Sequence, residues 1–187
     1  MQTITPTKTH QSKLLQRGIR QLIHQHLCNS INPHWLISFH YTTGKTQEEE
    51  VLQDTQDLKR KLHRIIYNSR DKSIKGAGAY PYPKMIFFHE ISHQGTGQYH
   101  THLITEALPP SINTQAAVEH LFAKILPSKV KALSKWKSID IQRIHQHDTD
   151  YRRISNYLTK QITPEHLSLD PFSSDLTTTH NRPRDAQ

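Results

Sequence analysis

Two histidines with strand spacing, His100 and His102, are the residues of this chain best suited to bind a metal. Residues 84–92 and 98–106 flank a glycine-containing segment, 92–97, which predicts two strands joined by a hairpin turn. Side chains at i and i+2 of a strand point to the same face, so the two imidazoles project together. Two neutral imidazoles on one rigid surface are typical of the start of a divalent-metal site.

A carboxylate on the first strand of this hairpin offers a third ligand. Glu90 and its neighbour His89 point to opposite faces of the strand, so only one of them can reach the histidine pair. We favour Glu90, because an oxygen ligand suits Mg²⁺ or Mn²⁺, whereas a set made only of histidines favours Zn²⁺ or Ni²⁺. The register of the hairpin decides between Glu90 and His89.

A tyrosine on a downstream helix offers a nucleophile. Residues 148–161 carry apolar side chains at helical spacing. On this predicted helix Tyr157 and Lys160 are three residues apart and share a face, so the ammonium can orient a phosphate beside the phenol. Tyr151 is a competing nucleophile, but it lies about 600° round the helix from Tyr157, on a different face.

Together these motifs resemble those of the HUH endonuclease superfamily, in its single-tyrosine branch of rolling-circle replication initiators. That family has a first strand, a His-hydrophobic-His motif on a central strand and a later helix with Tyr-x-x-Lys. The matching segments here are His34-Trp35-Leu36-Ile37-Ser38-Phe39, His100-Thr101-His102 and Tyr157-Leu158-Thr159-Lys160, in the same order. The resemblance covers roughly residues 34–162. It implies an antiparallel sheet of about four or five strands, helices on one face and a metal site on the sheet.

The resemblance also implies an activity, the metal-dependent nicking and joining of single-stranded DNA through a 5′-phosphotyrosine. Tyr157 would be the nucleophile, with Lys160 beside it. Mg²⁺ or Mn²⁺ would be held by His100, His102 and Glu90. The order of the motifs favours initiation of rolling-circle replication of a plasmid or phage, with a single-tyrosine transposase or a relaxase as alternatives. A non-catalytic nucleic-acid-binding domain of the same α+β type is an alternative of another class.

The charge of the chain favours a polyanionic partner. A net charge of +8 and a pI near 9.6 suit nucleic acid first and an anionic membrane second. A loop at 72–83 is rich in Gly, Tyr and Pro and could stack bases, although a purely structural loop explains it equally well. The candidate DNA contacts are Tyr80, Tyr82, Lys84, Arg152 and Arg153.

Cysteine content and hydropathy bear on the compartment. The single cysteine, Cys28, excludes an intramolecular disulfide and a cluster of several thiolates, which fits a reducing environment. No stretch approaches the roughly 20 apolar residues of a membrane span. The first residues lack the apolar segment of a signal peptide. We therefore expect a cytoplasmic protein with no membrane partner, and we favour a monomer.

Two further histidine pairs compete with His100 and His102. His24 and His26 fall on a predicted helix, where positions i and i+2 point apart. The other pair, at 145 and 147, ends a predicted strand just before a turn, which favours solvated loop residues.

The predicted elements mix strands and helices, which places the chain in the α+β class. Helices are predicted at 11–28, 46–69, 114–126 and 128–136, with Pro127 separating the last two, and again from 148. Strands are predicted at 35–41, 84–92, 98–106 and 138–145. We divide the chain into a basic tail and helix (1–33), an HUH endonuclease domain (34–165) and a flexible C-terminal tail or linker (166–187). The N-terminal helix is expected to pack on the domain through its apolar stripe.

Overall fold

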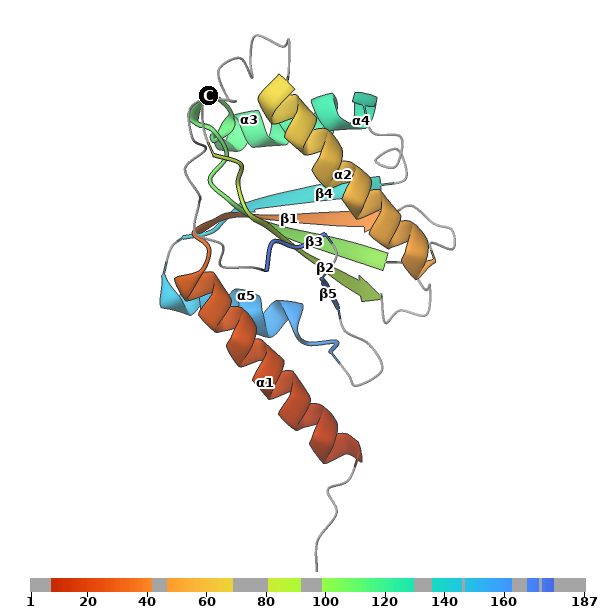
Figure 1. Ribbon diagram of the computed structural model, residues 1–187, viewed down its shortest axis with the longest axis vertical. Helices are drawn as coiled ribbons and strands as arrows, with labels where there is room; N and C mark the ends of the chain where they lie inside the picture. Colours follow the sequence, from red (N-terminus) through yellow and green to blue (C-terminus); the bar gives the residue numbers. More distant parts are fainter. Residues whose placement is uncertain are drawn as a thin grey trace, which may run out of the picture.

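The protein folds around a five-stranded antiparallel sheet, which confirms the predicted α+β class (Figure 1). The computed structural model describes residues 8–41, 47–68, 81–91, 99–129, 136–145, 147–162, 168–171 and 173–176. The strand order is β4-β1-β3-β2-β5. The strands are β1 (Pro33–Tyr41), β2 (Met85–Ile91), β3 (Tyr99–Glu106), β4 (Trp136–Arg143) and β5 (Leu169–Asp170). The helical segments are α1 (Lys8–Asn29), α2 (Glu48–Asn68), η2 (Pro110–Ile112), α3 (Gln115–His120), η3 (Leu121–Ile125), α4 (Leu126–Lys129) and α5 (Asp148–Leu158).

Strand alternation sorts the buried side chains into two cores, one on each face of the sheet. On one face, Trp35, Ile37 and Phe39 of β1 pack with apolar residues of α2, α3 and η3. On the other face, residues such as Leu36 and Phe88 pack with α1 and α5. Helices therefore cover both faces, and the expectation of helices on one face is wrong. The candidate site lies on the face that carries α1 and α5.

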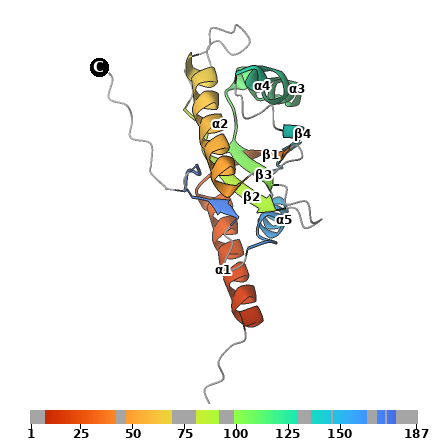
Figure 2. The ribbon, with the colours of Figure 1, turned by 90° about the vertical axis from the view of Figure 1, so that its right-hand side faces the viewer.

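The N-terminal helix α1 is part of this packed unit. Leu27 is completely buried and Ile23 nearly so, in one cluster with Ile154 and Leu158 of α5. The first turns of α1 extend beyond the sheet in both views (Figures 1 and 2). Leu14 and, further along the helix, Leu22 are exposed. A domain boundary at residue 34 would therefore cut through a shared core. Among the described residues, no helix is long and apolar enough to cross a membrane.

The segment that follows α5 adds an edge strand, although we expected a flexible tail over 166–187. β5 pairs with β2 through Asp170 and Phe87. Asp175 then accepts a hydrogen bond from the Met85 amide at 2.9 Å and pairs with Lys59 at 2.7 Å. The expectation is wrong for 168–171 and 173–176, because short side-chain and backbone contacts replace an apolar pattern there. Residues 177–187 lie outside the described residues.

The helix that begins at α3 continues through Pro127 instead of breaking there. The Leu126 amide donates to the carbonyl of Leu121, five residues earlier, so the turn is π-helical. A proline lacks the amide proton and clashes with the carbonyl four residues back in a regular α-helix. The π-helical turn lengthens the spacing of the backbone hydrogen bond from four residues to five just before the proline ring. The expected separate helix at 128–136 is therefore wrong at both ends, since α4 runs from 126 to 129 and β4 begins at 136.

Candidate metal and nucleophile site

Three neighbouring strands present a row of polar side chains on the face that carries α5. His100 of the central strand β3 is paired with His40 of β1 on one side and with Glu90 of β2 on the other. The next pair of β1 and β3 on this face is Ser38 with His102. Because directly paired residues of neighbouring strands share a face, the two predicted histidines and Glu90 stand beside one another.

His89, the other candidate third ligand, belongs to the opposite face. Its Nδ1 lies 3.0 Å from Thr101 Oγ1, and its Nε2 lies 3.2 Å from Asp170 Oδ2. His89 and Asp170 are both buried. The hydrogen-bond register therefore places Glu90, and not His89, beside the histidine pair.

His102 is oriented by a hydrogen bond to its inner nitrogen. Ser38 Oγ lies 2.8 Å from His102 Nδ1. The other nitrogen, Nε2, is buried and has no hydrogen-bond partner among the described residues, and it lies 3.5 Å from Glu90 Oε2. The tautomer that donates Nδ1–H to Ser38 leaves a lone pair on Nε2. Metal-ligating histidines are usually fixed in this way through their second nitrogen.

In the buried carboxylate of Glu90, one oxygen is paired with a lysine and the other has no hydrogen-bond partner among the described residues. Lys160 Nζ lies 3.0 Å from Oε2, whereas Oε1 is buried without a hydrogen-bond partner in the described part of the chain. Burial alone would raise the pKa of Glu90, but the proximity of His102 and Lys160, at 3.5 and 3.0 Å from Oε2, outweighs it and lowers the pKa. Glu90 is thus ionised at neutral pH, and an unpaired buried carboxylate oxygen favours a bound cation.

The electrostatics also keep His100 in the form that binds metals. Burial lowers its pKa, and the nearby His40 and His102 lower it further. Its imidazole is therefore neutral at pH 7, as a metal ligand must be. The His100 ring lies edge-on against His40, with ring centroids 4.3 Å apart. The nitrogen and oxygen donors of the predicted set are not gathered within 4.8 Å of one another in this conformation.

α5 carries the predicted nucleophile to this row. The ring of Tyr157 lies edge-on to that of His102, with centroids 5.2 Å apart, and Lys160 Nζ lies 3.7 Å from the centre of the Tyr157 ring. Lys160 lies two residues after Leu158, the last residue of α5, in a turn, and is not helical as expected. Tyr157 is 43% exposed, so its side chain is accessible from solution. The competing Tyr151 is half-buried against the core formed with α1.

Residues that the sequence analysis did not single out hold the end of α5. Gln16 of α1 donates through Nε2 to the carbonyls of Thr159, at 2.7 Å, and Lys160, at 2.9 Å. Arg20 Nε donates to Thr159 Oγ1 at 3.3 Å. Gln161 accepts a hydrogen bond from the Ile91 amide, next to Glu90 in β2, at 2.9 Å. These partners are far apart in the chain, so no local sequence pattern marks them.

His40 and Ser38 were also missed as members of the site, although a signal for them exists. Both lie on β1 at strand spacing from one another and alternate with the buried Phe39 and Ile37. Their alternation predicts that they share a face. Only the pairing of β1 with β3 shows that this face is the one with His100.

Two of the predicted DNA contacts lie away from this site. Tyr82 and Lys84 precede β2, at the opposite end of that strand from Glu90. The Tyr82 ring packs against His63 of α2, with centroids 4.8 Å apart, and Lys84 Nζ donates to the Ser30 carbonyl at 2.8 Å. Both side chains therefore make contacts within the fold. Tyr80 lies outside the described residues.

The two predicted arginines are exposed on α5. Arg152 Nε pairs with Asp148 at 2.7 Å, and Arg153 Nε lies 3.6 Å from Asp150. Arg153 precedes Tyr157 by four residues and shares its face, whereas Arg152 precedes it by five and does not. Arg153 is therefore the better placed of the two to meet a phosphate near Tyr157.

The two competing histidine pairs lie on α1 and just before α5. His145 and His147 are exposed at the start of α5. His24 of α1 lies 2.9 Å from Asp148, whereas His26 points elsewhere on the helix and its Nε2 is buried.

No model of a known protein family matches this chain, and no curated protein or solved structure is significantly similar to it. Functional inference therefore depends on the site itself.

Proposed function

We propose that this protein is a metal-dependent endonuclease of the HUH single-tyrosine type, which nicks and rejoins single-stranded DNA. The observation that carries the proposal is the contact between α5 and the sheet. Tyr157 lies against His102, and Lys160 pairs with Glu90. Two motifs that are far apart in the sequence thus meet at one place, as this chemistry requires.

The residues present fit a divalent cation. His102 Nε2 and Glu90 Oε1 are buried without hydrogen-bond partners among the described residues, and the neutral His100 stands next to both in the sheet. Two imidazoles and a carboxylate suit Mn²⁺, and the carboxylate also suits Mg²⁺. A bound ion would polarise the scissile phosphate as a Lewis acid.

Tyr157 is the proposed nucleophile. Its phenolic oxygen forms a bond to phosphorus, its proton leaves to solvent, and the bond from phosphorus to the 3′ oxygen breaks. The 3′ oxygen takes up a proton, and the 5′ end remains attached to Tyr157 as a phosphotyrosine. Lys160 would balance negative charge on the phosphate. Because the phosphodiester energy is retained, attack by a 3′-hydroxyl reverses the step and rejoins the strand.

Single-stranded DNA is the proposed substrate because one phosphate must enter between the sheet and α5. A duplex is stiff, and pairing holds its strands away from such a site. Arg153 shares the exposed face of Tyr157, and the net charge of +8 favours phosphate contacts whose affinity falls as salt rises. The order of the motifs, with the histidines before the tyrosine, favours a replication initiator.

A covalent-adduct assay tests the proposal. A single-stranded oligonucleotide library labelled at its 3′ ends is incubated with the protein and Mn²⁺, and labelled protein is resolved under denaturing conditions. We expect an adduct with the wild type and with Tyr151→Phe. Tyr157→Phe should form no adduct but should keep its DNA affinity, since only a hydroxyl is lost.

Histidine variants and substrate form provide the controls. His100→Ala and His102→Ala should lose Mn²⁺-dependent cleavage, whereas the exposed His145→Ala should keep it. An adduct with Tyr157→Phe, activity in the presence of a chelator, or equal cleavage of single strands and blunt duplex contradicts the proposal. Salt-dependent DNA binding without cleavage of any substrate would instead support the non-catalytic binding domain.

A further inference from the structure

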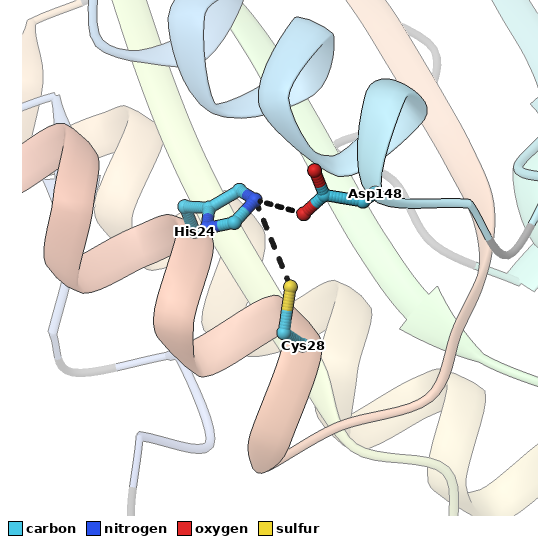
Figure 3. A group of neighbouring side chains, drawn as sticks. All are labelled: His24, Cys28 and Asp148. Atoms are coloured by element: carbon cyan, nitrogen blue, oxygen red, sulfur yellow. Dashed lines mark hydrogen bonds and ion pairs between the residues drawn. The ribbon is translucent and has the colours of Figure 1, made fainter.

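A second group of metal-binding side chains joins α1 to α5, outside the candidate active site (Figure 3). His24 and Cys28 lie one turn apart on α1, and Asp148 is the first residue of α5. His24 Nε2 lies 2.9 Å from Asp148 Oδ1 and 3.7 Å from Cys28 Sγ. All three donor atoms lie within 4.8 Å of one another. Cys28 and Asp148 are exposed, so an ion can enter from solution.

The separations of the donor atoms fit a tetrahedral zinc ion. With Zn–N and Zn–O bonds of about 2.0 Å and a Zn–S bond of about 2.3 Å, tetrahedral angles separate N from O by roughly 3.3 Å and N from S by roughly 3.5 Å. The observed 2.9 and 3.7 Å differ from these values by a few tenths of an ångström. A histidine and a cysteine at i and i+4 also present two ligands from one face of a helix.

A neighbouring arginine orients the carboxylate of this group. Arg152 Nε binds Asp148 Oδ2 at 2.7 Å, which leaves Oδ1 to face His24. Metal ligands are commonly fixed by such outer contacts. A Cys28 thiolate would make this donor set softer than that of Glu90 and its histidines, and softer donors favour zinc over magnesium.

We propose that His24, Cys28 and Asp148 bind a zinc-like divalent cation, with water as the fourth ligand. The Cys28 thiol releases its proton to solvent when the ion binds, and the thiolate becomes a ligand. The ion fastens α1 to the first turn of α5, while Gln16 and Arg20 of α1 already hold the other end of that helix. This site is independent of the proposed DNA chemistry and goes beyond it.

The single cysteine makes the site directly observable. Cys28 is the one cysteine in the sequence, so a thiolate-to-metal charge-transfer band can arise from this position alone. The metal-free full chain, kept reduced with a non-thiol reductant, is titrated with Co²⁺ and then with Zn²⁺. We expect a near-ultraviolet band that saturates at one ion per chain and is removed by Zn²⁺.

Matched variants separate this site from the other histidines. Cys28→Ser should lose the band, and His24→Ala and Asp148→Asn should weaken Co²⁺ binding by roughly tenfold or more. His145→Ala, an exposed histidine near the start of α5, and His102→Ala should keep the band and its affinity. Zn²⁺ should raise the melting temperature of the wild type by more than it raises that of Cys28→Ser.

Several results would overturn the inference. One is the absence of the band in the wild type. A second is unchanged affinity in both His24→Ala and Asp148→Asn, because the thiol would then bind the ion without these partners. A third is a stoichiometry of one ion per two chains with dimer formation, measured by analytical ultracentrifugation, because the thiolates would then come from two molecules.

Discussion

Replacing Asp170 with asparagine should weaken the fold in a pH-dependent way. Asp170 is buried in β5 and accepts hydrogen bonds from His89 at 3.2 Å, from the Ser173 amide at 3.0 Å and from Thr55 at 3.1 Å. Burial alone would raise its pKa, but the bonds from His89 and Ser173 lower it from 3.8 to about 2. At about 1.36 kcal/mol per unit, the ionised carboxylate contributes roughly 2 kcal/mol to the free energy of unfolding at pH 7.

The sign of the effect follows from the lowered pKa. The contribution is complete above the unfolded-state pKa near 4 and is lost as the pH falls toward 2, with roughly half gone by pH 3. Urea unfolding at pH 7, 5 and 3 measures it. We expect Asp170→Asn to lower the free energy of unfolding by about 2 kcal/mol at pH 7, and the difference from the wild type to shrink by pH 3.

An exposed aspartate on the opposite edge strand, Asp140, provides the control. Asp140→Asn should change the free energy of unfolding by less than about 0.5 kcal/mol at all three pH values. The buried carboxylate does not anchor β5 if Asp170→Asn has the same free energy of unfolding as the wild type at pH 7. The same holds if the difference in free energy of unfolding between the two proteins does not change with pH.

Two further predictions concern the packing of α1 and the orientation of His102. Leu27→Ala should lower the free energy of unfolding by about 2–5 kcal/mol, because Leu27 is completely buried. Leu22→Ala, at an exposed position of the same helix, should change the free energy of unfolding by less than about 0.5 kcal/mol. Equal effects of the two substitutions in urea unfolding would contradict the packing of α1. Ser38→Ala should lower Mn²⁺ affinity by about 10–100-fold, because it removes the partner of His102 Nδ1. Calorimetric titration measures this, and Ser138→Ala on the exposed edge strand β4 should bind as the wild type does.

Periodicity and motif order were sufficient to predict the elements around the candidate site. Apolar runs, alternation and turn residues predicted β1, β2, β3 and β4, and the helical stripes predicted α1, α2 and α5. These signals are local, and burial of one face imposes each of them. The choice between Glu90 and His89 is different, because a shift of one residue in strand pairing exchanges the faces. The pairing of Glu90 with His100 depends on the register of β2 and β3, which the sequence alone does not determine.

Features that depend on long-range polar contacts could not be predicted in this way. β5 is two residues long, and Asp170 and Asp175 are held by partners distant in the sequence, so no apolar period marks them. Tyr82 and Lys84 combine aromatic and basic character, which is typical of nucleic-acid contacts. Their side chains are used within the fold instead, against His63 and the Ser30 carbonyl. Composition describes what a side chain can bind, and the fold decides which partner is within reach.

The position of the proposed nucleophile depends on how α5 is held at both ends. A helix of 11 residues is only marginally stable by itself, so its place must come from tertiary contacts. Ile154 and Leu158 bury one face of α5 against the sheet and α1. Gln16 of α1 fixes the turn that carries Lys160, and His24 of α1 contacts the first residue of α5. The N-terminal helix therefore acts as a support for the tyrosine, although no candidate active-site residue lies on it.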